Sequence, residues 1–566
     1  MPTGDVELTI LDGGGSTVVV PSASIQVCIG TTSTGTPAVV TASRSPNTLT
    51  TNFGVGPGID QASTTINAGG TALFMKCATT TAGTVNKRAS TAITAVSLAA
   101  VITSTAHGLT TGDVVTVSGV TGATEVNVTG IVTVLTSATF TINGITAATA
   151  YVSGGTCAHT GVQQLNSGTS VCTVTGAPND AYLFKLLVTA AGTTGTSGIR
   201  FKLSADAGRT YGPEIALGTA ITYAVSGTGV TLNFVTATTM LLGGTITFAC
   251  TEPLPGVADI QACLVALEAS PYSSSGWGSM HIGGVWTGAQ AATIQGYLDT
   301  MVTTKTFTRA ILNVRDASYP ATYGGTGESD ATWSAAVALD VSAVSAKRIC
   351  LCAGNYNMAS NFPIGATGLP ILRRPASWAL AARQVTLAPQ NHAGRVSDGS
   401  LAQVIVDPTT DATDGFVYHD DYLAPVLDVA RLTSLRRRKG RGGFYIKNPN
   451  LMSPAGSVFT LLPLGNVMDI GCALLDQANT DFINSDIRLN NNGTIAEDAA
   501  QLIERRVNGV LRDRMFARSM ISDFSYAIDR TNNVRTTSTV NFTATLYSRG
   551  YILEIDGTVG FGQDGG

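Results

Sequence analysis

The stretch MHIGGVWTGAQAATIQGYLDTMVTTKTFTRAILNVRD, residues 280–316, decides the fold. Residues 280–286 are a short apolar run of the kind that forms a strand, and residues 287–304 space their apolar side chains as a helix does. Residues 309–316 are a second strand-like run. Strands that alternate with helices indicate βαβ units and a parallel or mixed sheet.

The same alternation continues on both sides of this stretch. A helix is expected over 330–346, with Asp330 as its N-cap, and a strand over 347–354. Residues 1–91 have a β-α-β order, in which the strands SIQVCIG and TALFMKCA flank the helix GPGIDQASTTINAGG. We therefore expect a discontinuous α/β (α+β) core, built from an N-terminal part at 1–91 and from residue 266 onward.

Between these two parts the helical spacing disappears. Residues 92–162 alternate short strands with glycine turns, which indicates a small antiparallel barrel or sandwich. Residues 163–265 are again all β, and TEPLPG at 251–256 is a linker signal. We expect two β modules inserted on the outside of the core, where insertion is tolerated. The main core then occupies 266–480, and a helix with two strands occupies 481–566.

The clearest amphipathic helix lies in this last segment. TIAEDAAQLIERRVNGVLRDRMFAR, residues 494–518, keeps its apolar side chains on one face. Thr494 with Glu497 three residues later has the pattern of a capping box. A strand is expected at 537–548, followed by a last strand, YILEIDGTV, at 551–559.

This last strand raises the question of its partner. Tyr551, Leu553 and Ile555 share one face, and the segment SRG before it supplies a hinge. Two partners are open: the preceding strand, as a hairpin within one subunit, or the sheet of a neighbouring subunit. We favour the second, together with the strand VELTI, in which Val6, Leu8 and Ile10 alternate.

The composition narrows the class of protein. Only 12% of the residues are charged, about half the usual share of about 25%. The chain is 44% hydrophobic with alternating apolar residues, which argues against disorder and for a β-rich protein that buries surface in an assembly. A net charge of −4 gives no reason to expect nucleic acid or a membrane as partner. No apolar run is long enough to span a bilayer, and MPTGDVELTI does not have the pattern of a secretory signal.

No motif indicates catalysis, a cofactor or a metal. The glycine-rich GGTGES lacks the ending of a phosphate-binding loop, and no nucleophile elbow is found. Nine cysteines are scattered along the chain. Cys350 and Cys352 are predicted to be buried thiols of a core strand, which fits a protein kept in a reducing cytoplasm.

The segment SADAGRTY resembles the Asp-box of sialidases and other glycan-active proteins. In that motif the acidic residue bonds backbone amides and the glycine takes a positive φ. The matching residues are Ser204, Asp206, Gly208 and Thr210. Because there is one copy and no blade-length repeat, we predict a structural turn rather than a glycosidase.

The segment SLRRRKGRGG is the basic run of the sequence. Its charged residues are Arg436, Arg437, Arg438, Lys439 and Arg441. Nucleic-acid binding is disfavoured because no aromatic residues are interleaved. Two interpretations stay open: a solvated hairpin, or an electrostatic contact with an acidic neighbouring subunit.

Taken together, this layout resembles that of contractile phage tail sheath proteins. SIQVCIGTTSTGTP and GPGIDQASTTINAGGTALFMKCA look like the first strand–helix–strand of the sheath core. GGFYIKNPNLMSPAGSVFTLLPLGNVMDI resembles the hairpin and following segment before the C-terminal helix of that family. AHGLTTGDVVTVSGV looks like a small β module that recurs in phage structural proteins.

The resemblance implies a non-enzymatic structural subunit of a virion tail, assembled in the host cytoplasm. Copies polymerise helically around the tail tube, contact baseplate and tail terminator proteins, and contract to drive the tube through the host envelope. Terminal strands exchanged between subunits join the copies; the residues implied here are Val6, Leu8, Ile10, Tyr551, Leu553, Ile555 and Val559. Two alternatives are a glycan-binding or glycan-cleaving tail protein, suggested by the Asp-box-like turn, and a plain capsid or tail-tube component.

Overall fold

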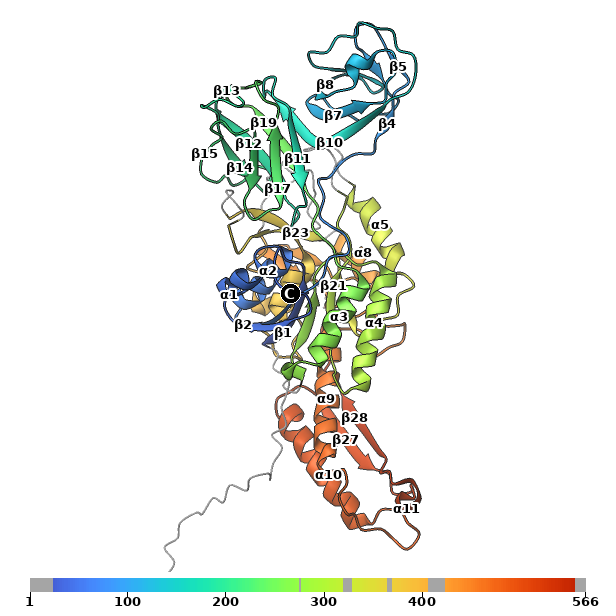
Figure 1. The fold of residues 1–566 in the computed structure, drawn as a ribbon. Coiled ribbons are helices and arrows are strands. Elements are labelled where there is room, and N and C mark those ends of the chain that lie inside the picture. Colours follow the sequence, from blue (N-terminus) through green and yellow to red (C-terminus); the bar gives the residue numbers. More distant parts are fainter. Residues whose placement is uncertain (1–23, 274–275, 319–327, 364–368, 406–422, 555–566) are drawn as a thin grey trace, which may run out of the picture.

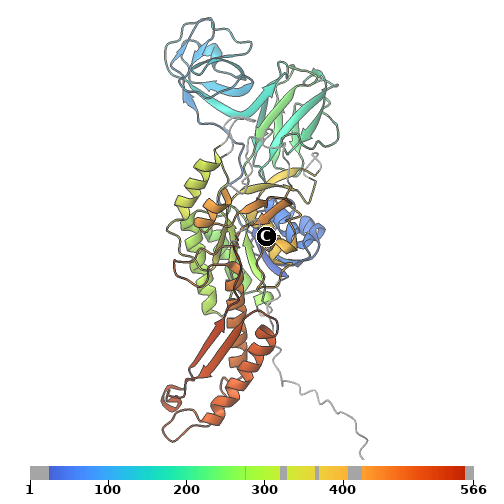
Figure 2. The ribbon, with the colours of Figure 1, turned by 180° about the vertical axis from the view of Figure 1, so that it is seen from behind.

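The computed structural model describes residues 24–273, 276–318, 328–363, 369–405 and 423–554. The molecule is elongated, with an α/β region in the middle, two β units at one end and a C-terminal unit of helices and a hairpin at the other (Figure 1). The same arrangement is seen from behind in Figure 2. The predicted strand with Val6, Leu8 and Ile10 lies outside the described residues, as do Ile555 and Val559.

A six-stranded sheet in the order β2-β3-β1-β20-β21-β22 forms the middle of the α/β region. Its strands are β1 (Ile25–Gly30), β2 (Val40–Ser43), β3 (Thr71–Lys76), β20 (Ser279–Ile282), β21 (Ala310–Asn313) and β22 (Ile349–Cys352). All neighbours are parallel except the edge strand β2, which is antiparallel to β3. The chain leaves the sheet after Lys76 and returns at Ser279 beside β1. The predicted mixed α/β class is confirmed.

Helices cover both faces of this sheet, and for this reason its strands are almost continuously apolar. One face packs against α3 (Val257–Glu268), α4 (Gly288–Thr303) and α5 (Asp330–Val341), and the other against α1 (Pro46–Phe53), α2 (Pro57–Asn67) and α6 (Ala376–Gln384). In β1, Val27 and Ile29 join the first cluster and Cys28 joins the second. Ser329 caps α5, so the predicted N-cap Asp330 is instead its first residue.

The cysteines are reduced. All nine are free thiols, eight of them buried and Cys472 partly so. Cys350 and Cys352 lie in the hydrophobic cluster beneath α6. The interpretation of these two residues as buried thiols of a core strand is confirmed.

Residues 91–161, the first β unit, and 162–250, the second β unit, form the end of the molecule above the α/β region in Figure 1. The first contains β4 (Thr91–Ala92), β5 (Ala95–Val96), β6 (Ile102–Thr103), β7 (Asp113–Ser118), the short helix η1 (Thr124–Val126), β8 (Thr129–Thr136) and β9 (Thr139–Ile142). The second contains β11 (Cys172–Gly176), β12 (Leu183–Ala190), β13 (Gly192–Thr193), β14 (Arg200–Ser204), β15 (Ile215–Ala216), β16 (Thr222–Val225), β17 (Val230–Phe234), β18 (Thr239–Met240) and β19 (Thr245–Ala249).

The two β units share one long strand, β10 (Thr156–Leu165). Its first half pairs with β7 and its second half with β19, and the register with β7 shifts between His159 and Gln163. The predicted boundary between 162 and 163 therefore falls inside a strand. An eleven-stranded sheet thus runs through both units, although their hydrophobic clusters are centred on different strands.

The chain then builds hairpins and the C-terminal unit. The elements are β23 (Asn355–Ala359) with β24 (Ile371–Pro375), α8 (Leu423–Val429), β25 (Leu435–Arg438) with β26 (Arg441–Ile446), α9 (Leu462–Thr480), α10 (Glu497–Leu511), β27 (Asp523–Ile528), α11 (Val534–Thr537) and β28 (Phe542–Tyr547). A π-helical turn at Arg512–Phe516 extends α10. The strand expected at 537–548 corresponds to β28, whereas β27 is absent from the sequence prediction.

Two local predictions in this unit are wrong. The capping box at Thr494 does not form, because α10 begins at Glu497 with Ala496 as N-cap, and the Glu497 carboxylate is bound by Arg530 instead. The described part of the last predicted strand, Tyr551–Glu554, is not a strand. The polar local partner of Thr494 is Asn492, within the preceding turn.

Candidate assembly surfaces and junctions

The hairpin β27–β28 is the candidate surface for strand exchange. Its two strands pair antiparallel from Asp523 opposite Tyr547 to Ile528 opposite Phe542. One side packs on α10, where Tyr526 and Ile528 join the hydrophobic cluster of that helix. Each strand has a single strand partner among the described residues. Since a two-stranded hairpin alone is marginally stable, this sheet gains from any further strand.

The hydrogen-bond register of the hairpin shows which backbone N–H and C=O groups of β28 do not bond to β27. The Asp529 N–H donates to the carbonyl of Asn541 at 2.8 Å, so these two residues form a hydrogen-bonded pair. In an antiparallel ladder the alternate residues point their backbone groups outward. Phe542, Ala544 and Leu546 therefore direct their N–H and C=O groups away from β27, along a free edge.

This edge has none of the usual protection against pairing. Natural edge strands carry charges or prolines that prevent pairing with another chain. From Thr536 to Ser548 the sequence contains no charged residue and no proline. Phe542 and Tyr547 expose about half of their surface. The edge of β28 is thus an open template for another strand.

Over residues 549–554 the chain leaves β28 and does not pair with it. The Tyr551 hydroxyl donates to the carbonyl of Gln390 at 2.7 Å, and its ring lies 5.7 Å from that of His392 in the α/β region. Ile552 and Leu553 are exposed. Over Tyr551–Glu554, the alternative of a hairpin with the preceding strand is therefore wrong, because β28 pairs with β27 and not with these residues.

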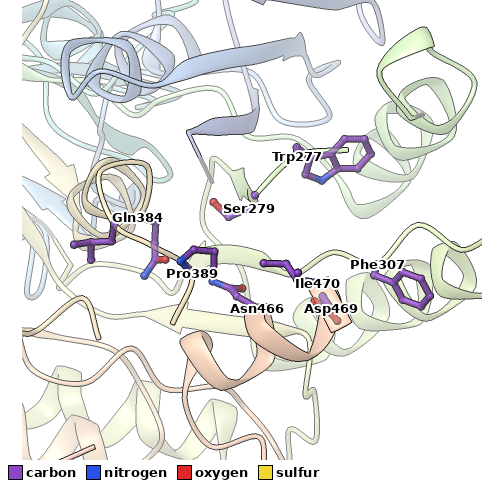
Figure 3. Close-up of a pocket in the computed structure, with 10 residues that line it drawn as sticks. Trp277, Ser279, Phe307, Gln384, Pro389, Asn466, Asp469 and Ile470 are labelled. Carbon is purple, nitrogen blue, oxygen red and sulfur yellow. The ribbon is translucent and has the colours of Figure 1, made fainter. Parts of the chain in front are cut away.

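A buried ionic cluster joins α9 of the C-terminal unit to the α/β region, and its acidic member, Asp469, is labelled in Figure 3. The Asp469 carboxylate on α9 accepts hydrogen bonds from Arg309 Nη2 at 3.1 Å and from Arg348 Nη1 at 3.0 Å, and it lies 2.9 Å from Arg309 Nε as an ion pair. All three side chains are more than nine-tenths buried. The cavity beside them has a volume of about 20 Å³, which is enough for about one water molecule. It is lined by Trp277, Ser279, Phe307, Gln384, Pro389, Asn466 and Ile470, and it is too small for an organic ligand.

The Asp-box-like turn forms the contact between the second β unit and the α/β region. Asp206 accepts hydrogen bonds from the Ser204 hydroxyl at 2.7 Å and from the Thr210 N–H at 2.9 Å and hydroxyl at 2.7 Å. It also accepts from the N–H of Ile371, the first residue of β24, at 3.0 Å. Gly208 has a φ of +93°. Asp206 is 1% exposed, so its carboxylate serves the turn and the junction.

Arg374 on β24 strengthens the same junction. Its guanidinium binds Asp60 of α2 at 2.8 Å and Asp180 of the second β unit at 2.6 Å. Burial lowers the pKa of Arg374, but Asp180 and Asp60 outweigh this effect and the pKa is raised overall. Leu372, also on β24, belongs to the hydrophobic cluster of the second β unit. The second β unit is therefore anchored on the α/β region by a buried, fully paired contact.

Next to this contact lies a cavity of about 280 Å³. Glu252 lines it and receives no hydrogen bond from the described residues. Burial and, to a lesser extent, the nearby Asp180 raise the pKa of Glu252 while Arg374 lowers it, and the net result is a rise from 4.5 to about 7. Glu252 is thus the unpaired acid of this junction.

A third cluster holds the two β units together. Asp113 on β7 binds Arg88 at 3.2 Å and His159 at 3.4 Å, and the Thr110 N–H donates to it at 2.7 Å. Gln163 of β10 also donates to Asp113. The cluster lies where the register of β10 shifts, at the point where this strand passes from the first β unit to the second.

The basic run forms the hairpin β25–β26. Arg436, Arg437 and Arg438 all have interaction partners within the chain. Lys439 and Arg441 lie at the turn and are exposed. The hypothesis of an electrostatic contact loop stays a prediction, and it rests on Lys439 and Arg441.

The sequence analysis did not predict the ionic junctions, although charged residues within apolar runs indicate them. In a chain with 12% charged residues, Asp469 in VMDIG, Asp113 in GDVVTV and Arg374 in ILRRPA interrupt apolar runs. A charge in such a run is buried and needs a partner. The partners themselves lie far away in the sequence, at separations of 160 residues for Asp469 and Arg309 and 314 for Arg374 and Asp60.

Among the described residues, no group of three or more His, Cys, Asp or Glu side chains is arranged to hold a metal ion. In the same part of the chain, no helix has both the length and the apolar content needed to cross a bilayer.

Comparison with known proteins adds the following. The crystal structure of a sheath tail protein from Desulfitobacterium hafniense matches 96% of this chain and 100% of its own, with 10% identity and a TM-score of 0.42. That of a sheath tail protein from Listeria innocua matches 92% and 94%, with 10% identity and a TM-score of 0.39. The structural match is to tail sheath proteins. The helical sheath of the anti-feeding prophage in its contracted state matches 56% of this chain and 78% of its own, with 11% identity and a TM-score of 0.37.

Sequence comparison is more limited. Residues 97–160 match the family described as ubiquitin-activating enzyme E1 FCCH domain, which corresponds to most of the first β unit. No curated protein sequence matches the chain.

Proposed function

We propose that this chain is a structural, non-enzymatic subunit of a contractile phage tail sheath. Copies polymerise helically around the tail tube by exchanging strands, and contraction of the polymer drives the tube through the host envelope. The observation that carries the proposal is the uncharged edge of β28, which has no partner strand among the described residues, in a sheet that counts two strands there. Tail tube, baseplate and tail terminator proteins are the other partners, and the assembled protein belongs to the virion tail.

The strands that fill this edge come from neighbouring copies. Strand addition uses main-chain hydrogen bonds, so any extended segment with alternating apolar residues can pair with Phe542, Ala544 and Leu546. The two donors are residues 6–10 and 551–559, which alternate in this way. Ile552 and Leu553 expose their side chains to solvent and are available for such pairing.

The strands exchanged between copies and the buried ionic clusters within each copy have different roles in contraction. The clusters around Asp469, Arg374 and Asp113 join the parts of one subunit through buried charges, so we infer that each subunit moves as one body. The exchanged strands join subunits through backbone contacts that do not fix the orientation of the bodies. Subunits can then repack between two discrete arrangements while the links persist. Contacts between different surfaces of neighbouring copies that do not form a closed ring produce a helical polymer.

We further propose that the two β units, expected at 92–162 and 163–265 and joined through β10, are modules inserted into the sheath core. The second module ends before α3, Val257–Glu268, which packs on the central sheet, so the core comprises 1–91 and 257–480 and the strand-exchange arm 481–566. The return of the chain to the central sheet beside β1 supports this division. The glycan-active alternative gains no support, because all acceptor sites of Asp206 serve internal donors.

One residue tests the acceptor edge with little effect on the hairpin. Ala544→Pro removes an outward N–H of β28 and leaves the bonds to β27, as edge positions tolerate proline. Ala544→Ser keeps the N–H and is the matched control. Deletions of residues 1–12 and 550–566 remove the donors.

Electron microscopy of the purified chain should show long helical polymers for the parent and for Ala544→Ser. It should show short or no polymers for Ala544→Pro and for both deletions. A parent chain that stays monomeric at high concentration would refute the proposal, as would an Ala544→Pro variant that polymerises as well as its control.

A further inference from the structure

The end of the second β unit that lies farthest from the α/β region carries no charge. We call it the distal tip and define it as residues 165–171, 190–199, 217–221 and 235–244. These segments contain no Asp, Glu, Lys, Arg or His. Charged residues make up about a quarter of an ordinary protein sequence, and most of them lie on the surface. A whole end of a domain without any is therefore unusual.

Backbone hydrogen bonds show that these segments form one surface. The N–H of Val235 donates to the carbonyl of Val171 at 3.1 Å, and that of Phe234 donates to Ile221 at 2.8 Å. The N–H of Thr194 donates to Thr238 at 2.8 Å. The tip lies around β13, at the end of the second β unit away from the α/β region in Figure 1.

The tip exposes large apolar side chains. Leu165, Ile221, Val235, Leu241 and Leu242 are each between 43% and 69% exposed. A single exposed apolar residue is ordinary, but a group of them on a surface without charge marks an interaction site. The charges of this unit lie outside the tip: Asp180, Asp206 and Arg209 are at or beside the junction with the α/β region, and Lys185, Arg200, Lys202 and Glu214 are on and beside β12 and β14.

The absence of charged and aromatic side chains from the distal tip determines which class of partner fits it. Nucleic acid and anionic lipid bind through Lys and Arg, which the tip lacks. Sugar rings pack on aromatic side chains, and the tip contains none. A second copy of this chain brings the same uncharged apolar surface, so two units meet without like-charge repulsion and without the cost of burying an unpaired charge.

We propose that the distal tip is an interface through which the second β unit of one copy contacts the second β unit of a neighbouring copy. The inference rests on the proposed function, because a helical polymer holds many copies at a regular spacing. The contact adds a link on the side of the polymer opposite to the C-terminal unit, since the two lie at opposite ends of the subunit. Such a contact is weak for one pair and is reinforced by the strand links.

Photo-crosslinking tests this interface directly. A benzophenone amino acid replaces Leu242 in the tip or, as the control, Val152, which is 71% exposed in the first β unit. In polymers, Leu242 should crosslink copies through the second β unit, and Val152 should not. A charged variant gives a second readout: Leu241→Asp with Leu242→Asp should lower the yield of a crosslink placed at Val235 about tenfold. The matched pair Leu98→Asp with Val152→Asp should leave that yield unchanged.

The outcomes separate this inference from the proposed function. Polymers that form normally but show no crosslinks from Leu242 overturn the tip interface alone. A chain that never polymerises refutes the sheath function. Crosslinking of the concentrated protein then decides the interface: dimers from Leu242 support it, and their absence overturns it. Co-sedimentation of the chain with neutral phosphatidylcholine vesicles, lost in the charged tip variant, would assign the tip to lipid and also overturn the inference.

Discussion

Replacement of Asp469 by asparagine should lower the free energy of unfolding, because it disrupts the ionic contact between the C-terminal unit and the α/β region. Asp469 is the shared partner of Arg309 and Arg348, and all three are buried. Asp469→Asn removes the negative charge but keeps the shape. It leaves the buried Arg309 guanidinium without a counter-charge, and it leaves Arg348 with only the half-exposed Asp299, at 3.4 Å. Removal of one partner of a buried pair costs about 3–5 kcal/mol of the free energy of unfolding.

The same helix provides the control. Asp476 on α9 pairs with Lys305 at 3.5 Å, and the Lys305 side chain is 63% exposed. Asp476→Asn should therefore cost no more than about 1 kcal/mol. Urea unfolding followed by tryptophan fluorescence measures both, and Trp277 lies in the junction.

A triple variant checks the cause. When Arg309→Met and Arg348→Met accompany Asp469→Leu, no unpaired charge remains, and most of the lost stability should return. The reasoning is refuted if Asp469→Asn destabilises no more than Asp476→Asn.

Three further predictions concern the other junctions and the basic hairpin. Because burial raises the pKa of Glu252 to about 7, its protonation stabilises the fold fully below pH 4.5, and this stabilisation is lost as the pH rises through 7. Glu252→Gln should thus raise the free energy of unfolding by about 1–3 kcal/mol at pH 8 and leave it unchanged at pH 4, as measured by urea titrations at both pH values. Asp206→Ala should cost about 2–4 kcal/mol and expose the Ile371 amide to hydrogen exchange, since buried donors lose their acceptor; unchanged exchange would contradict the role of the turn. Lys439→Glu with Arg441→Glu should leave thermal unfolding unchanged but slow polymerisation in light scattering at low salt, with the difference removed at high salt.

The regular elements of the α/β region could be predicted from sequence periodicity. The helix expected at 287–304 is α4, Gly288–Thr303, and the strand expected at 309–316 contains β21, Ala310–Asn313. In both cases the apolar spacing is set by burial against the central sheet. The sequence pattern was sufficient for these two elements, because the periodicity of their apolar residues matches the face that packs on the central sheet.

Capping and pairing were harder to predict because they depend on the fold around them. Glu497 has the right spacing from Thr494 for a capping box, but Arg530, far along the chain, binds its carboxylate and the helix starts later. The sequence places the boundary between the two β modules at residue 162, but β10 pairs with strands of both modules. Turn residues mark where strands end, and they do not show which strands pair. The ionic clusters around Asp469 and Arg374 join residues more than one hundred positions apart, so only the topology brings them together.

The free edge of β28 could be recognised only with the hairpin in view. The sequence predicts a strand at 537–548 and one at 551–559. It leaves two partners open for the last strand, the preceding strand or a neighbouring subunit, and the second is favoured. The structure pairs β28 with β27 and directs Tyr551 to Gln390. Among the described residues this leaves the edge of β28 without a partner strand and Ile552 and Leu553 exposed, which is the arrangement that strand exchange between copies requires.

A reconstruction of the polymer by electron cryo-microscopy, at a resolution that traces the backbone, tests the central claim most directly. The account predicts that the β27–β28 sheet contains at least one further strand contributed by another copy, paired along Phe542, Ala544 and Leu546. A polymer in which this sheet keeps only its own two strands would contradict it.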